Sequence, residues 1–571
     1  MRFIRINAAE GRITEEQGPD KYIKYGGRSL SSRIISDEVP ATCHPLGPRN
    51  KLVIAAGLLG GTTAPCSGRI SIGVKSPLTG GIKESNVGGN FGTYIARAGI
   101  RAIIFEGFPK DNKLSYLVIG AEGLSLEDAS DYRGMGTYEL AKHLREKHGQ
   151  KAAILCVGPA GEQRLAASAI MSTDLDGNPS RAAARGGPGA VLASKGIKAV
   201  VALPVAASNA RYTNEIEFKK IAREFGKLLI ETKGGLTKLG TAAMVAAADK
   251  LGGMPTHNYK EGSFAGAKEM SGEKLFEVIT ERGGMPTRSC HTGCVIRCSN
   301  VFKTKSGEYV TGSLEYETMV LVGSNLGISD LDSIAMIDRT LDDLGLDSID
   351  TGVALGIAME QGLLKWGDAE GVIALLNEVR VKTAAGKLIG SGAAVVGKVL
   401  GAHRVAEVKG QATVAYDPRT FKGMGCSFAT SPMGADHTSG PAIPGRIGLD
   451  PDKKFELTEA EGQAELSRDL QIMITVVDSM GYCFFVGPDM ANMSRTAALL
   501  NALYGWDMKF EDVLDIGIST LNVEKRFNRD AGISEGADRL PDFFYDEPLP
   551  PTGRTFDIPR EDLRGLDYNL K

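Results

Sequence analysis

Alternating hydrophobic and polar positions characterise the first third of the chain. This period of two predicts β-strands, and glycine-rich loops separate the alternating segments. The predicted strands cover residues 1–7, 101–106, 114–119, 152–157 and 197–203. Residues 140–147 have helical spacing instead. We therefore predict a β-rich domain over residues 1–207.

From about residue 210, apolar residues recur every three to four positions, which predicts helices. These segments are 214–232, 274–280, 331–344, 349–364, 368–380, 458–477 and 495–504. Thr458 and Glu461 have the spacing of a capping box, so we expect a helix to start at Thr458. The proline-rich, acidic end from Leu540 is expected to run over the surface. The predicted fold class is α+β, with the β-rich domain followed by two mainly helical domains, 208–410 and 411–571.

Composition narrows the possible partners. The 571 residues are 42% hydrophobic and 24% charged, as in soluble globular proteins, and the net charge is −3. This charge argues against nucleic acid or an anionic membrane as the main partner. No apolar run approaches the roughly 20 residues of a membrane-spanning helix, and the first residues lack a signal-peptide core. We expect a cytoplasmic protein.

Four cysteines form a candidate metal site. Three are closely spaced, and the fourth is remote: Cys290, Cys294, Cys298 and Cys483. Such a set can hold a [4Fe–4S] cluster, because each iron of the cluster needs one thiolate. Zinc is the alternative, although its sites usually contain cysteine pairs separated by two residues, and both gaps here hold three. The other cysteines are expected to be buried apolar residues: Cys43, Cys66, Cys156 and Cys426.

The fourth cysteine belongs to one of two similar segments. Asp342-Asp-Leu-Gly345-Leu-Asp347 and Asp478-Ser-Met-Gly481-Tyr-Cys483 each end a predicted helix and turn at glycine. A new helix is expected to start at Asp347. Helix starts offer free N–H groups and a positive dipole end, so the pair of segments could hold two similar halves of one ligand. The alternative is a pair of ordinary helix-capping turns.

Over essentially its whole length, the chain resembles the tungsten-containing aldehyde:ferredoxin oxidoreductase family. Besides the cysteines and the two Asp-x-x-Gly segments, the resemblance rests on Ser67-Gly-Arg69, Lys75-Ser-Pro-Leu-Thr-Gly, Ser85-Asn86-Val-Gly88-Gly, Arg185-Gly-Gly-Pro-Gly-Ala-Val, Pro255-Thr-His-Asn258-Tyr, Glu315-Tyr-Glu317-Thr and Gly434-Ala-Asp-His437. It implies a tungsten or molybdenum ion held between two pterins, with one [4Fe–4S] cluster beside one pterin. It also implies an N-terminal domain of two β-sheets that forms a base under this bis-pterin cofactor, capped by the helical domains.

The resemblance also implies which residues contact the pterins, their phosphates and a bridging Mg²⁺. Arg69 suits a phosphate because its guanidinium is planar, charged and bidentate. Residues 182–186 are expected to form a loop; from the residues alone, this segment could be a simple turn before the strand at Ile197. The full implied set is Arg69, Asn86, Gly88, Ala182, Ala183, Arg185, Gly186, Asp342, Leu346, Asp347, Gly481, Tyr482 and Phe484.

Glu317 and His437 match the family's active-site pair. Apolar neighbours should raise the pKa of Glu317 toward the range of a general base, although a surface glutamate is the alternative. His437 can hydrogen-bond a substrate oxygen. The implied reaction oxidises an aldehyde to a carboxylic acid with water and passes electrons through the cluster to ferredoxin or a ferredoxin-like subunit.

Two other functions stay open. One is a family relative that reduces acids or aromatic thioesters as a subunit of a larger complex; an oligomer is possible in any case. The other is a non-catalytic iron–sulfur electron-transfer protein. The chain departs from the family's usual pattern in two places, since three residues rather than two separate Cys290 from Cys294, and Tyr482 replaces leucine. No Glu-x-x-His motif occurs near Met336, so we expect no mononuclear iron.

Overall fold

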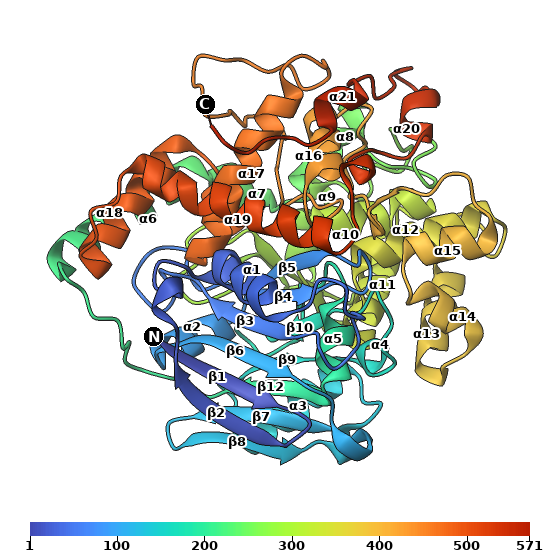
Figure 1. Cartoon of the computed structure of the whole chain (residues 1–571). Helices are drawn as coiled ribbons and strands as arrows, with labels where there is room; N and C mark the ends of the chain where they lie inside the picture. The colour runs from blue at the N-terminus through green and yellow to red at the C-terminus, as the bar shows by residue number, and fades with distance from the viewer. Residues whose placement is uncertain (571) are drawn as a thin grey trace.

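The computed structural model describes residues 1–570, and its β-rich first part lies beneath the helices in Figure 1. The first sheet has the strand order β2-β1-β6-β3-β4-β5. Only β1 and β6 pair in parallel. The strands are β1 (Arg2–Asn7), β2 (Arg12–Gln17), β3 (Leu52–Ala56), β4 (Ile70–Lys75), β5 (Ile82–Val87) and β6 (Ile100–Glu106).

The second sheet repeats the topology of the first. Its order is β11-β10-β9-β12-β7-β8, so each strand has a counterpart six positions earlier. Again the single parallel pair joins the first and last strands of the unit, β7 and β12. The strands are β7 (Ser115–Gly120), β8 (Gly123–Asp128), β9 (Ala153–Cys156), β10 (Ile170–Ser172), β11 (Arg181–Ala183) and β12 (Ile197–Ala202). The β domain is therefore an internal duplication.

The two sheets bury one hydrophobic core between them. Ile54 and Phe105 of the first sheet belong to the same buried cluster as Leu155 and Val200 of the second. Helices cover the outer faces, α1 (Gly27–Glu38) on the first sheet and α3 (Thr137–His148) on the second. Three shorter helices complete the domain: α2 (Phe91–Arg97), α4 (Pro159–Glu162) and α5 (Pro188–Ser194).

The rest of the described chain is mainly helical. Its first part contains α6 (Glu215–Thr232), α7 (Gly234–Leu239), α8 (Ala243–Leu251), α9 (Gly272–Glu281), α10 (Tyr316–Leu321), α11 (Leu331–Leu344), α12 (Ser348–Glu360), α13 (Ala369–Val381), α14 (Ala384–Ile389) and α15 (Ala393–Leu400). Small sheets join β13 (Met285–Arg288), β14 (Ser299–Lys303) and β15 (Tyr309–Gly312), and β16 (Glu407–Val408) and β17 (Gln411–Ala412). The last helices are α16 (Lys422–Thr430), α17 (Gln463–Met480), α18 (Met490–Tyr504), α19 (Phe510–Asp530), α20 (Phe543–Asp546) and α21 (Arg560–Leu563).

The predicted α+β class is confirmed, and each strand or helix predicted from periodicity overlaps one of these elements. One local prediction is wrong. Helix α17 begins at Gln463 rather than Thr458, because Gly462 has a left-handed φ of 72° that no helix continues through. The end of the chain runs over the surface, with residues 550–553 and 559–562 exposed, but the buried rings of Phe543, Phe544 and Phe556 anchor it in the core.

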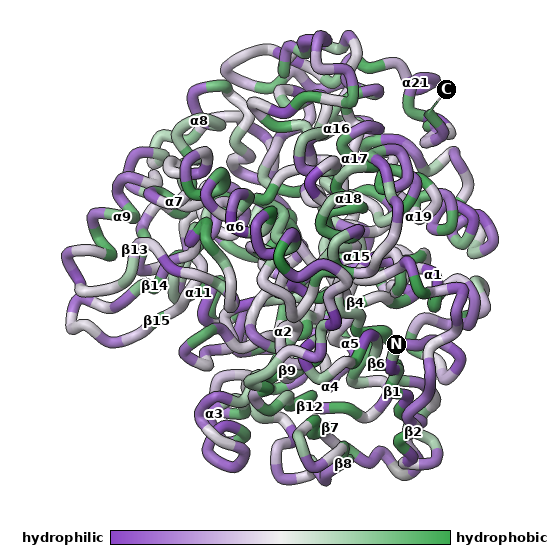
Figure 2. Tube along the Cα trace, turned by 90° about the vertical axis from the view of Figure 1, so that its left-hand side faces the viewer, coloured by the Kyte–Doolittle hydropathy of each residue, from purple (hydrophilic) through white to green (hydrophobic). Residues whose placement is uncertain are grey.

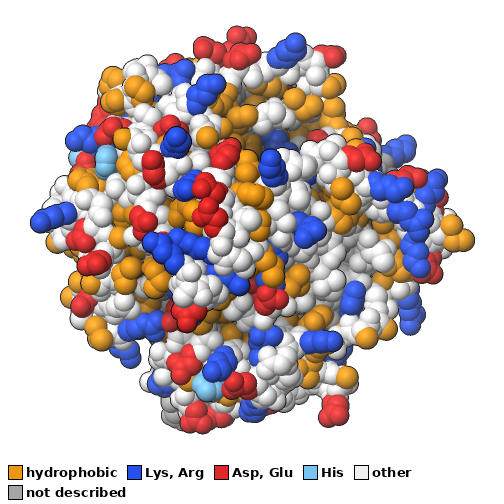
Figure 3. Space-filling model, turned by 180° about the vertical axis from the view of Figure 1, so that it is seen from behind, with side chains coloured by type: hydrophobic (Ala, Val, Ile, Leu, Met, Phe, Trp, Pro, Cys, Tyr) orange, Lys and Arg blue, Asp and Glu red, His pale blue; other side chains and the backbone are white. Residues whose placement is uncertain are grey.

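Hydrophobic segments lie mostly inside the molecule and hydrophilic segments follow its outline (Figure 2). On the face seen from behind, basic and acidic side chains are interspersed rather than gathered by sign (Figure 3). Among residues 1–570, no single helix is both long and apolar enough to cross a membrane. Only the joined segments Tyr316–Leu326 and Leu331–Leu344 pass that test together, and they are bent by 114°.

Candidate metal and cofactor site

The first Asp-x-x-Gly segment is held by the second sheet. Helix α11 ends at Gly345, whose φ of 69° is left-handed, and Asp347 caps the start of α12 through its side chain. These are the predicted glycine turn and the predicted helix start. The Ala169 N–H donates to the Gly345 carbonyl (2.8 Å), and the Asp347 N–H donates to the Ala167 carbonyl (2.9 Å). The loop between β9 and β10 thus fixes the position of this turn.

The second segment is held in the equivalent way by the first sheet. Helix α17 ends at Gly481, with a φ of 78°. The Arg69 N–H donates to the Gly481 carbonyl (3.1 Å), and the Cys483 N–H donates to the Cys66 carbonyl (2.8 Å). A side chain at Gly57 would collide with the Gly481 backbone, so glycine is required for this approach. The loop between β3 and β4 is the counterpart of the loop between β9 and β10.

Arg69, Asn86 and Gly88 lie together on the first half of the domain. The Arg69 Nε donates to the Asn86 Oδ1, and its Nη2 donates to the Asn86 carbonyl (3.3 Å). A Cβ on Gly88 would lie 3.1 Å from the Arg69 Nη1 and 3.5 Å from the Cys290 Sγ. The missing side chain therefore lets the loop after β5 approach both the guanidinium and the cysteine trio.

In the second half of the β domain, Arg185 follows β11. This place corresponds to the loop after β5 in the first half. The guanidinium is buried, and its Nη1 donates to Asp347 Oδ2 (3.1 Å). Its Nη2 donates to the carbonyls of Ala412 (2.5 Å) and Ala435 (2.7 Å). Arg185 thus connects the β domain, the first Asp-x-x-Gly segment and the loop that carries His437.

The expectation of one continuous loop over residues 182–186 is wrong in its first part. Ala182 and Ala183 belong to β11, where they pair with Met171 and Ile170 of β10. Gly186 has a left-handed φ of 84°, and a Cβ there would collide with the Lys83 side chain. Helix α5 follows directly, so the Arg-Gly-Gly-Pro segment joins an edge strand to a helix start.

The four candidate cysteines are buried and lie together. The donor atoms of Cys290, His291 and Cys294 lie within 4.8 Å of one another. The Cys66 backbone joins their loop to Cys483, because the Cys66 N–H donates to the Gly293 carbonyl (2.9 Å) and the Cys66 carbonyl accepts from the Cys483 N–H (2.8 Å). The exposed Thr292, Gly293 and Arg297 bring this group close to the surface. Four buried cysteines in this part of the fold fit the number of thiolates that a [4Fe–4S] cluster needs.

A fifth cysteine, Cys66, also belongs to this group. The prediction that it is buried is confirmed, but it is not an ordinary core residue, because its backbone hydrogen bonds connect the Gly293 carbonyl with the Cys483 N–H. One indication of this location was available in the sequence, because Cys66 lies three residues before Arg69, a predicted cofactor contact.

Glu317 and His437 approach each other from different parts of the chain. Glu317 lies in α10, and its Oε2 accepts a hydrogen bond from the Ala415 N–H (2.7 Å). Its burial raises its pKa, against the opposing effects of His437 and Arg185. The alternative of a surface glutamate is therefore wrong. Beside His437 lies Phe484, with ring centres 6.3 Å apart.

The remaining predicted residues differ in what they can contact. Tyr482 is buried against Phe225, with its ring edge-to-face at 6.0 Å, so its side chain lies in the helical core. Leu346 is buried and bridges to Ser168. Asp342 accepts a hydrogen bond from the Tyr138 hydroxyl (3.3 Å). Burial raises the pKa of Asp342 well above its ordinary value, which favours the protonated carboxyl.

One charged pair beside the site was missed by the sequence analysis. Lys83 of β5 and Asp436, which precedes His437, form a buried ion pair. Burial alone would raise the pKa of Asp436, but Lys83 and Arg185 hold it far below its ordinary value. The pair fixes the His437 loop to the first sheet.

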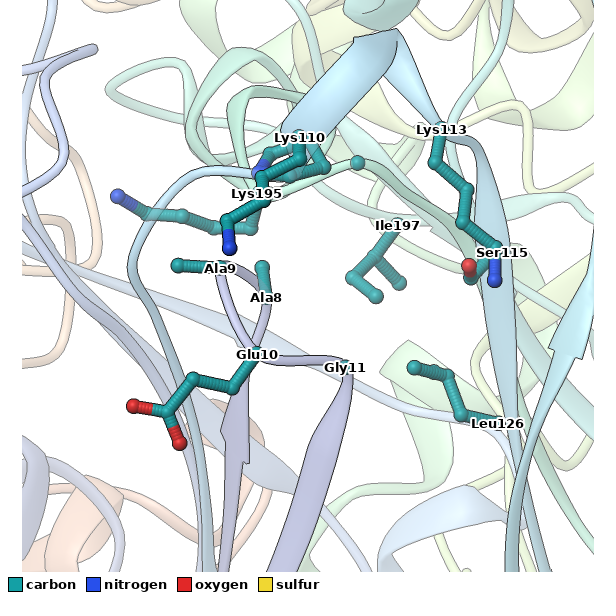
Figure 4. A pocket seen from close by; sticks show the side chains of 12 residues that line it. Ala8, Ala9, Glu10, Gly11, Lys110, Lys113, Ser115, Leu126, Lys195 and Ile197 are labelled. Atoms are coloured by element: carbon teal, nitrogen blue, oxygen red, sulfur yellow. The ribbon is translucent and has the colours of Figure 1, made fainter.

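A surface cavity elsewhere is unrelated to these residues. It has a volume of about 230 Å³ and lies beside the turn between β1 and β2 (Figure 4). Glu10, Lys110, Lys113 and Lys195 contribute its charged lining. It contains none of the predicted cofactor residues, so it is not the candidate site.

Four of the predicted site residues have a buried polar atom without a hydrogen-bond partner among the described residues. These atoms are Asn86 Nδ2, Arg185 Nε, Glu317 Oε1 and His437 Nδ1. Native proteins rarely leave such atoms unsatisfied. Two of them are donors and one is an acceptor, while the imidazole nitrogen can be either. This mixture of donors and an acceptor fits a polar ligand such as a pterin cofactor with phosphate groups.

Comparison with known proteins agrees with this arrangement. Residues 3–203 match the family description "Aldehyde ferredoxin oxidoreductase, N-terminal domain", and residues 219–565 match "Aldehyde ferredoxin oxidoreductase, domains 2 & 3". A tungsten-containing aldehyde ferredoxin oxidoreductase of Pyrococcus furiosus is 34% identical, with 96% of this chain and 92% of that protein aligned. The chain belongs to the aldehyde ferredoxin oxidoreductase family.

More distant relatives extend the comparison. The WOR-like subunit of an aliphatic sulfonate oxidoreductase of Pyrococcus furiosus is 29% identical, over 78% of this chain and 76% of that protein. The solved active-site complex BamBC of benzoyl coenzyme A reductase has the same fold, with a TM-score of 0.80 and 18% identity. The alignment covers 98% of this chain and 92% of that one.

Proposed function

We propose that this protein oxidises aldehydes to carboxylic acids, using a tungsten or molybdenum ion held by two pterins. The observation that carries the proposal is the pair of equivalent loops, which hold the two Asp-x-x-Gly segments, with the cysteines beside only the second. A duplicated site suits a ligand with two similar halves. The name of the 34% identical relative supplies the metal and the substrate class.

The first half would bind one pterin and its phosphate through Arg69, Asn86 and Gly88. The second half would bind the other through Arg185, Gly186 and Asp347, and a Mg²⁺ ion would bridge the phosphates. Four thiolates, Cys290, Cys294, Cys298 and Cys483, would hold one [4Fe–4S] cluster. When bound, the metal–pterin group would polarise the substrate carbonyl and accept two electrons.

Glu317 and His437 would handle the protons and the substrate oxygen. The unpartnered Oε1 of Glu317 can take a proton from water as the water oxygen forms its bond to the carbonyl carbon. The Nδ1 of His437 can hydrogen-bond the carbonyl oxygen as negative charge develops on it. Each turnover consumes one aldehyde and one water and yields one acid, two protons and two electrons.

The electrons would leave one at a time through the cluster to a ferredoxin or a ferredoxin-like subunit in the cytoplasm. The exposed positions of the cysteine loop, Thr292, Gly293 and Arg297, are the proposed contact with this partner, because they cover the buried cysteines. The names of the two more distant relatives favour one other candidate, a different substrate handled within a larger complex.

The test is a panel of aliphatic and aromatic aldehydes with a viologen dye as electron acceptor, assayed without oxygen. We expect aldehyde-dependent dye reduction and one equivalent of acid per two dye molecules reduced. Dye reduction with sulfonates, or oxidation of pre-reduced dye with aromatic thioesters, together with no dye reduction by any aldehyde, would support the other substrate class. Metal-loaded protein that is inactive with every substrate would contradict the proposal.

A further inference from the structure

Two polar side chains other than the four ligand candidates enter the cysteine site. Cys66 comes from the loop between β3 and β4. Its N–H donates to the Gly293 carbonyl (2.9 Å), and its carbonyl accepts from the Cys483 N–H (2.8 Å). Its backbone therefore joins the cysteine loop to the remote fourth cysteine. This placement holds Cys66 in a left-handed conformation, with a φ of 56°, and leaves its side chain fully buried.

The Cys66 thiol points at a ligand candidate. The buried Cys66 side chain neighbours Cys294, whose sulfur also receives the Arg297 N–H at 3.5 Å. A metal-bound thiolate can only accept hydrogen bonds, so the S–H of Cys66 would be the donor to the Cys294 sulfur. The buried Cys156 and Cys426 belong to β9 and α16 and have no contact of this kind with the ligand candidates.

His291 is the second side chain. It lies in the longer first gap of the cysteine trio and is fully buried. Its Nδ1 lies 3.1 Å from the Cys290 Sγ, while its Nε2 has no partner among the described residues. A Cβ on Gly68 would lie 2.8 Å from the imidazole Cδ2, so glycine makes room for the ring. The imidazole can therefore donate to the Cys290 sulfur.

We propose that Cys66 and His291 are positioning residues that donate hydrogen bonds to the Cys294 and Cys290 sulfurs and thereby raise the reduction potential of the cluster. Reduction adds one negative charge, which spreads over the cluster and its sulfur ligands. Donors near these sulfurs stabilise the reduced form more than the oxidised form. The inference rests on the proposed cluster, and it does not require a particular aldehyde substrate.

The experiment measures the cluster potential in protein purified without oxygen, by redox titration followed with electron paramagnetic resonance. Iron content is determined on the same samples. We expect Cys66→Ala and His291→Ala to keep their iron and to shift the potential to more negative values, with a larger shift in the double variant. Cys66→Ser and His291→Asn retain a donor, so each should recover part of the shift. Cys156→Ala and Cys426→Ala are the matched controls and should leave the potential unchanged.

Three results would overturn the inference: an unchanged potential in both alanine variants, a shift to more positive values, or loss of iron in Cys66→Ala or His291→Ala. The last result would make that residue a ligand rather than a donor. These outcomes differ from failure of the proposed function, which would appear as wild-type protein that contains the cluster but neither tungsten nor molybdenum.

Discussion

Replacing Glu317 by glutamine removes the titratable group and keeps the size of the side chain. The wild-type Oε2 accepts from the Ala415 N–H at 2.7 Å, and the glutamine oxygen can accept the same bond. The Oε1, which has no partner among the described residues, is the atom proposed to take the proton. The change therefore tests proton transfer with little change in packing.

The expected effect on activity is large. A positioned general base contributes about 10²- to 10⁴-fold to a rate, which corresponds to roughly 3–5 kcal/mol of activation free energy. We expect Glu317→Gln to lose aldehyde-dependent viologen reduction by about this factor, with its metal and iron content unchanged. Glu315→Gln is the matched control. The Glu315 carboxylate accepts hydrogen bonds from Thr241 and Ser313, and the variant should keep most of its activity.

Although Glu317→Gln should lose activity, it should become more stable than the wild type as the pH rises. Burial raises the pKa of Glu317 above its ordinary value of 4.5, so the folded protein holds this proton more tightly than the unfolded chain does. The wild type therefore loses stability as the pH rises from 4.5 toward the folded pKa, and the glutamine variant does not. Thermal unfolding between pH 4 and 8 should show a growing advantage for Glu317→Gln. Near wild-type turnover would exclude Glu317 as the general base. A stability advantage of Glu317→Gln over the wild type that shrinks as the pH rises would exclude a raised pKa for Glu317.

Three further variants test the surroundings of the site. Lys83→Met leaves the buried Asp436 unpaired and should cost about 3–5 kcal/mol in denaturant unfolding at pH 7. Because the pKa of Asp436 is lowered, the pair stabilises the fold above pH 3.8 and this stabilisation is lost at lower pH. The difference in unfolding free energy between wild type and Lys83→Met should therefore shrink in acid. A difference that stays constant with pH would contradict the pairing. Cys483→Ser should lower the iron content and abolish the cluster signal while the pterin metal stays bound; an intact cluster would exclude Cys483 as a ligand. Gly57→Ala forces a Cβ into the Gly481 backbone and should lower both Tm and metal content; unchanged values would contradict the close approach.

Local features of the structure could be predicted from the sequence. Periodicity located the main strands and helices, because an apolar stripe must face a core whatever the tertiary arrangement. Gly345 and Gly481 could be recognised as helix ends, because a left-handed residue ends a helix and glycine adopts that conformation at no steric cost. The prediction at Thr458 failed for the same reason, since the left-handed Gly462 lies between Thr458 and the helix.

Long-range features could not be predicted in this way. The duplication of the β domain is a matter of strand order, which periodicity does not encode. Cys66 has no motif spacing to the trio and reaches Cys294 only because backbone hydrogen bonds join three distant loops. The pairing of Lys83 with Asp436 likewise depends on how the third part of the chain packs on the first sheet.

Metal analysis of protein purified without oxygen decides whether the chain holds both a cluster and a bis-pterin metal. We expect about four irons and about one tungsten or molybdenum ion per chain, because four cysteines serve one cluster and two equivalent loops serve one bis-pterin cofactor. Four irons with neither tungsten nor molybdenum would instead identify a non-catalytic electron-transfer protein and would exclude the proposed aldehyde oxidation.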